Sequence, residues 1–139
     1  MKIKSAGALF FCTNTRRYLF LLRDNHRHAN TWCFPGGKVH KNETEFEGVM
    51  REIEEELGMT VPYKKVLPIE KFTSADKKFE YQTFVFIIMN EFIPILNNEH
   101  SGYCWTKLNG WPKPLHPALF SSLNEQTIKD KLITIEDTF

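Results

Sequence analysis

The chain of 139 residues has the length and the hydrophobic content of one folded domain. Hydrophobic residues make up 42% of it and aromatic residues 14%, which supports a packed core and excludes a disordered tail. Eighteen Lys and Arg residues against seventeen Asp and Glu residues give a formal net charge of +1, so overall charge attracts neither nucleic acid nor an anionic membrane. We therefore expect a single domain over residues 1–139, in which any affinity for phosphate is local.

The cysteines and the apolar runs indicate the compartment. Cys12, Cys33 and Cys104 are odd in number and form no CxxC pair, which favours reduced, buried thiols over disulfides or a zinc site. No apolar run reaches the roughly 20 residues that a membrane-spanning helix needs, and residues 1–8 lack the apolar run of a signal peptide. We expect a soluble, cytoplasmic protein with no membrane partner.

Two strands and a helix are the first predicted elements. Residues 6–12 and 18–22 are apolar or aromatic runs with a polar connection, which predicts a hairpin. Thr44 followed by Glu47 is a capping-box pattern, and Gly58 is suited to a left-handed C-cap, which together predict a helix between Thr44 and Gly58.

That helix has an apolar face and an acidic face. The apolar face, which we expect to be buried, consists of Phe46, Val49, Met50, Ile53 and Leu57. On the opposite face Glu52, Glu55 and Glu56 converge and are expected to point outward together, with only Arg51 beside them to offset the repulsion. Such carboxylates suit Mg²⁺, which can bridge to phosphate oxygens. A solvated acidic face is the alternative when the glutamates are taken alone.

The remaining chain continues an α/β pattern. We predict strands at 66–72, 81–89 and 102–108, with 92–96 continuing or pairing with the second of them, and helices at 116–124 and 126–135. The strand at 81–89 is almost continuously apolar, so we expect it to be central. The order of elements favours an α/β domain with a mixed sheet between helices.

The spacing of residues 37 to 59 is the most specific signal in the chain. Its defining positions are held by Gly37, Glu43, Arg51, Glu52, Ile53, Glu55, Glu56, Gly58 and Met59. This pattern resembles the Nudix box of the MutT-like Nudix hydrolase family, and residues 32–38 look like the strand and turn that precede it there. The resemblance implies the Nudix fold, a mixed β-sheet sandwiched between α-helices.

The resemblance also implies residue roles. Glu52, Glu55, Glu56 and the Gly37 carbonyl would bind Mg²⁺, for which Mn²⁺ can substitute, and Glu55 or Glu56 would deprotonate the attacking water. Arg51 would brace the carboxylates. Two further positions, Glu43 and Gly58, would support the site structurally.

Outside the box the candidates have competing interpretations. Glu99 is a candidate metal ligand or base, or else an exposed loop glutamate, and we interpret His100 beside it as a solvated loop histidine. His116 leads the later helix and is a candidate for contact with substrate, although a histidine at this position is more often an ordinary helix-leading residue.

Further substrate contacts are weaker candidates. Arg23, Arg27 and Lys38 could hold phosphates, with a simple surface role as the alternative. Phe79 or Tyr81 could stack on a base, although strand aromatics more often belong to the core. His26 and His28 lie in a polar loop with too few other ligands for a metal site.

Function is therefore expected to be Mg²⁺-dependent hydrolysis at phosphorus in a nucleoside diphosphate linked to another group. The favoured substrate is a small nucleotide, such as a nucleoside triphosphate, oxidised or not. A sugar nucleotide or ADP-ribose is the alternative, and a catalytically silent nucleotide- or partner-binding module is the alternative of another class. Nucleic acid is not expected as a partner except as a nucleotide end, and homodimers are common in the family.

Overall fold

The computed structural model describes residues 2–25 and 27–139, so His26 lies outside the described residues. Seven strands form one sheet: β1 (Ile3–Cys12), β2 (Arg17–Arg23), β3 (Trp32–Cys33), β4 (Gly36–Lys38), β5 (Lys65–Thr73), β6 (Phe79–Ile88) and β7 (His100–Thr106). Three helices accompany it: α1 (Glu45–Leu57), α2 (Pro117–Leu123) and α3 (Gln126–Thr138). The predicted α/β architecture with a mixed sheet is confirmed.

Strand β1 runs through the middle of the sheet. It pairs in parallel with β6 from Ile3↔Phe79 to Cys12↔Ile88, and β5 pairs antiparallel with the far edge of β6. The last eight residues of β1 are all buried, and so is the second half of β6. Continuous burial of this kind explains why these strands read as apolar runs rather than as alternating ones. The predicted central place of residues 81–89 is confirmed.

The other edge of β1 is divided between two partners. The predicted hairpin forms at its end, where Phe11 pairs with Tyr18, but the strands then diverge, and β4 pairs with the first half of β1 through Ala6↔Gly37 and Gly7↔Gly36. Strand β2 continues away with β7 and β3 as its neighbours. The turn between β3 and β4 therefore lies where the two halves of the sheet separate.

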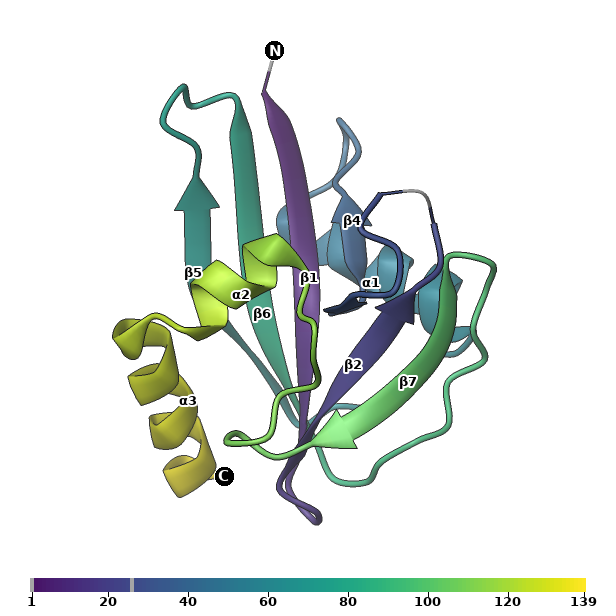
Figure 1. The fold of residues 1–139 in the computed structure, drawn as a ribbon, viewed down its shortest axis with the longest axis vertical. Coiled ribbons are helices and arrows are strands. Elements are labelled where there is room, and N and C mark those ends of the chain that lie inside the picture. Colours follow the sequence, from purple (N-terminus) through teal and green to yellow (C-terminus); the bar gives the residue numbers. More distant parts are fainter. Residues whose placement is uncertain (1, 26) are drawn as a thin grey trace.

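Helices cover both faces of the sheet. In Figure 1, α1 lies behind β1 and β4, while α2 crosses in front of β6 and β1 and leads into α3 beside β5. The predicted ends of α1 are confirmed: Thr44 Oγ1 accepts a hydrogen bond from Glu47 N at 3.1 Å, and Gly58 adopts φ 67°. Caps at both ends fix where the box helix begins and ends.

Three sequence predictions need correction. Residues 92–96 form no strand, because Pro94 interrupts them and Ile95 N instead donates to Leu57 O at the end of α1 (2.8 Å). The strand predicted at 102–108 is β7, two residues earlier. Phe46 is 36% exposed rather than buried.

Among the residues that the structure describes, no helix is both long and apolar enough to cross a bilayer.

Candidate active site

The three box glutamates differ in burial, contrary to the prediction that they point outward together. The Glu56 residue is 2% exposed, whereas the side chains of Glu52 and Glu55 are 13% and 53% exposed. Helical spacing sets the direction of a side chain, but the neighbouring layers decide its burial. Here the turn before β4 lies against Glu56, whose carboxylate oxygens are 3.3 and 3.4 Å from Gly36 N.

Arg51 joins the loop before α1 to the acidic face of the helix. Its guanidinium donates to both oxygens of Glu43, from Nε at 2.8 Å and from Nη2 at 3.1 Å, and Nη2 also donates to the Lys38 carbonyl at 2.8 Å. Nη1 donates to Glu52 at 2.9 Å and reaches Glu55 at 3.3 Å. Hydrogen bonding to Arg51 lowers the pKa of Glu43 to about 2. Arg51 therefore occupies one side of the carboxylates and holds β4 against the helix.

Glu56 is a buried carboxyl group with too little positive charge around it. Burial, followed by the nearby Glu52 and Glu99 carboxylates, raises the pKa of Glu56 to about 10. A divalent cation would reverse this effect, because it favours the ionised carboxylate. The oxygen donors of this cavity are also the type that Mg²⁺ prefers.

The close approach of the Gly37 backbone to the Glu52 carboxylate also suits a Mg²⁺ site. A Cβ atom built at Gly37 would lie 2.7–2.8 Å from the Glu52 carboxylate, so only glycine leaves this space open. Among the residues described, no three His, Cys, Asp or Glu side chains form a preassembled metal cage. Mg²⁺ does not require one, since it keeps waters and takes oxygens from phosphate.

The glutamates open into a polar cavity of about 370 Å³. It is lined by Arg23, Asn25, Cys33, Phe34, Gly36, Gly37, Lys38, Glu52, Glu56, Glu99 and His100. Arg23 is held in place by Asn25 and by the Arg27 carbonyl, and Glu99 accepts from Asn97 at 3.2 Å. The structure thus brings Arg23, Lys38 and Glu99 to the box carboxylates. Arg27 contributes its backbone carbonyl, which accepts a hydrogen bond from Arg23.

An apolar pocket of about 290 Å³ adjoins the polar cavity, and the two share Phe34. Phe79, Tyr81 and His116 line it, which places all three weak candidates for substrate contact in one pocket. Burial lowers the pKa of His116 to about 4, and its Nδ1 accepts from Ala118 N at 3.1 Å. His116 therefore caps α2 as a neutral ring whose remaining N–H is at Nε2.

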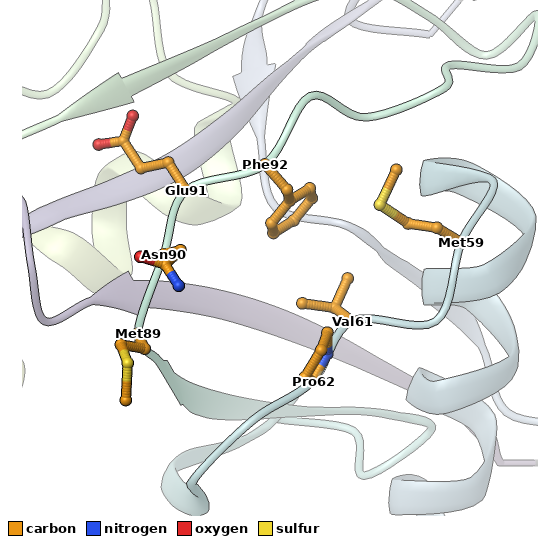
Figure 2. Close-up of a pocket in the computed structure, with 7 residues that line it drawn as sticks. All are labelled: Met59, Val61, Pro62, Met89, Asn90, Glu91 and Phe92. Atoms are coloured by element: carbon orange, nitrogen blue, oxygen red, sulfur yellow. The ribbon is translucent and has the colours of Figure 1, made fainter.

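A third hollow, of about 200 Å³, lies between the segments that follow α1 and β6. Figure 2 shows the Met59, Val61 and Phe92 side chains pointing toward one another there, while the Glu91 carboxylate points away. That carboxylate is paired with Arg17 at 2.6 and 2.7 Å. The hollow therefore presents an apolar surface without a free charge for phosphate.

Sequence reasoning missed His100 as a part of the cavity. It is 7% exposed and begins β7 opposite Arg23, so the interpretation as a solvated loop histidine was wrong. Cys33 was also missed, because the pairing of β3 with β2 that places it at the cavity is a long-range contact. The start of a strand at His100 was the available signal, and the predicted boundary fell two residues too late.

The NUDIX domain model matches residues 1–125 of the chain. Nudix hydrolase 7 of Arabidopsis thaliana is 28% identical over 90 residues, covering 63% of this chain and 32% of that protein, so the chain spans about a third of the length of this curated relative.

Two solved structures share both sequence and fold with the chain. The MutT protein from Methanosarcina mazei Go1 has 29% identity and a TM-score of 0.69, with 94% of this chain and 95% of that chain covered. The MutT NUDIX hydrolase from Burkholderia pseudomallei has 25% identity and a TM-score of 0.68, with coverages of 91% and 98%. The matched domain and these similarities identify the chain as a member of the Nudix hydrolase family.

Proposed function

We propose that the protein hydrolyses the diphosphate linkage of a small nucleotide in a Mg²⁺-dependent reaction, with water attacking phosphorus. The observation that carries the proposal is a pair of cavities that share Phe34 as a lining residue, one lined by carboxylates and arginine and the other by aromatic rings. A nucleoside diphosphate has the same division, with charge at one end and a flat base at the other. Family membership supports the type of reaction, since Nudix enzymes typically depend on a divalent metal.

In the proposal Glu52, Glu56 and the Gly37 carbonyl hold Mg²⁺ inside the cavity, and Glu55 joins them at its exposed rim. The metal supplies charge neutralisation of the diphosphate and a more acidic water. Arg51 keeps Glu52 and Glu55 oriented, because its other nitrogens are bound to Glu43 and to the backbone.

Glu99 is proposed as a further ligand or as the base that accepts the proton of water. It faces the box glutamates across the polar cavity, and its exposed carboxylate has only Asn97 as a side-chain hydrogen-bond donor among the described residues. Arg23 and Lys38 line the same cavity, where their charges suit phosphate oxygens.

The apolar pocket is proposed to bind the base. Phe34, Phe72, Phe79 and Tyr81 supply its aromatic surface, and stacking of a base on such rings contributes about 1–3 kcal/mol. The pocket also contains Glu70, which Ser122 Oγ binds, and Glu125. Acidic groups without a lining Lys or Arg disfavour a phosphate there, so the diphosphate belongs in the polar cavity.

The proposal is tested by a Mg²⁺-dependent screen of nucleoside triphosphates, oxidised purine triphosphates, dinucleoside polyphosphates, ADP-ribose and sugar nucleotides. Glu56→Gln provides the blank, and Glu54→Gln, an exposed glutamate on the same helix, provides the matched control. We expect one substrate class to be turned over far faster than the rest, with loss in Glu56→Gln alone. Folded protein that binds Mn²⁺ and hydrolyses none of these compounds would refute hydrolysis and favour the binding-module alternative.

A homodimer is common in the family, and sedimentation would measure whether this protein forms one. The three cysteines are free thiols in the structure, which suits the proposed cytoplasmic location.

A further inference from the structure

His100 is a buried histidine at the wall of the polar cavity. It is 7% exposed and lines the polar cavity together with Glu52, Glu56 and Glu99. Its Nδ1 atom is buried and has no hydrogen-bond partner within the described residues. An unpaired buried nitrogen destabilises the folded state, so its presence beside a carboxylate has a physical reason.

Both ring nitrogens of His100 face specific groups. Nε2 lies 3.5 Å from Cys33 Sγ, and Nδ1 lies 3.7 Å from Glu56 Oε1. The second distance exceeds that of a hydrogen bond, so the two side chains must move closer to form one. The imidazole therefore lies between a buried thiol and a buried carboxyl group.

The environment determines which nitrogen carries the proton. A neutral imidazole has one N–H donor and one ring-nitrogen acceptor, so the partner of one nitrogen selects the role of the other. Burial raises the pKa of the Cys33 thiol to about 12, so the thiol keeps its S–H. When that S–H donates to Nε2, the ring proton is at Nδ1 and is directed at Glu56. When a bound cation keeps Glu56 ionised, the opposite tautomer would place the Nδ1 lone pair against its carboxylate.

We propose that His100 is a positioning residue for Glu56, in which Nδ1–H donates to Oε1 and fixes the rotamer that presents the carboxylate to the cavity. The inference rests on the proposed function for the identity of Glu56 as a metal ligand. Cys33 orients the ring from the other side, and β7 supplies the rigid backbone. Partners of this type, which act through a ligand, commonly change metal affinity by about 10–100-fold.

The first test is the Mn²⁺ affinity of the protein without substrate, measured by electron paramagnetic resonance. His100→Ala should weaken binding by about 10–100-fold. His100→Asn keeps an amide N–H near the place of Nδ1 and should retain affinity within about threefold, whereas His100→Gln carries its amide toward the place of Nε2 and should behave like alanine. His40→Ala is the matched control, since that ring is also 3.7 Å from a glutamate, Glu43, but its side chain is 64% exposed.

A double-mutant cycle separates positioning from general stability. In a Glu56→Gln background, His100→Ala should cause no further loss of Mn²⁺ affinity, because the group on which His100 acts has been replaced. An equal loss in both backgrounds, or unchanged affinity in the single variant, would overturn the inference.

Nitrogen-15 NMR of the Mg²⁺-bound wild type supplies a signature that does not depend on any variant folding. We expect the His100 proton at Nδ1, and a proton at Nε2 overturns the inference. Wild-type protein that binds no Mn²⁺ would refute the metal site, and with it both proposals. Wild type that binds Mn²⁺ but hydrolyses nothing would refute only the proposed function.

Discussion

Replacing Glu56 by glutamine should make the metal-free protein more stable while abolishing its activity. The raised pKa of Glu56 means that the folded state disfavours its ionised form. The protonated Glu56 carboxyl group therefore contributes its full stability below the unfolded pKa of 4.5, and this contribution is lost as the pH rises toward about 10. Glutamine has a similar shape and does not ionise, so the variant avoids this loss.

The magnitude follows from the titration. At pH 7 the unfolded wild-type chain has lost the Glu56 proton and the folded chain keeps it. This difference lowers the free energy of unfolding by about 1.4 kcal/mol for each pH unit above 4.5. The upper limit is therefore about 3 kcal/mol, or a rise in Tm of about 5–10 °C. Below pH 4.5 the stabilities of the two proteins should converge.

The assay is urea and thermal unfolding in chelator at pH 4.5 and pH 7, with Glu54→Gln as the exposed control on the same helix. Added Mg²⁺ should then stabilise wild type and the control but not Glu56→Gln, because a ligand that binds only the folded state raises its stability. A Glu56→Gln protein no more stable than wild type at pH 7, or a difference that does not change with pH, would refute the reasoning.

Other substitutions test the neighbours of Glu56. Arg51→Lys loses the paired contact with Glu43 and should reduce turnover by about 10–100-fold and lower Tm, and unchanged kinetics would contradict a bracing role. Gly37→Ala places a Cβ 2.7 Å from the Glu52 carboxyl carbon and should weaken Mn²⁺ binding with little change in Tm; calorimetry showing wild-type affinity would argue against this cradle. Phe79→Ala should raise KM by about tenfold or more at similar kcat, and an unchanged KM would remove the apolar pocket from the substrate site.

The box helix illustrates how much local sequence determines. The capping pair Thr44 and Glu47 and the glycine at 58 define the ends of α1, because these contacts join residues close together in the chain. The same locality makes the β1–β2 hairpin and the helix capped by His116 predictable.

Burial within the site depended on tertiary structure instead. Glu55 and Glu56 are adjacent in the sequence, but only Glu56 lies beneath the turn at Gly36, because β4 pairs with β1 at that point. The prediction of a strand at 92–96 was wrong because the backbone of this segment donates a hydrogen bond to the end of α1 rather than pairing with a strand.

The sequence by itself therefore determined the family pattern, the box helix and the acidic residues that characterise the site, since these depend on fixed short spacings. Only the tertiary structure placed Glu99, Arg23 and the buried His100 around the carboxylates and joined the aromatic pocket to them at Phe34. These groups come from strands and loops far apart in the chain. Their meeting depends on strand pairing and register, which no local pattern encodes.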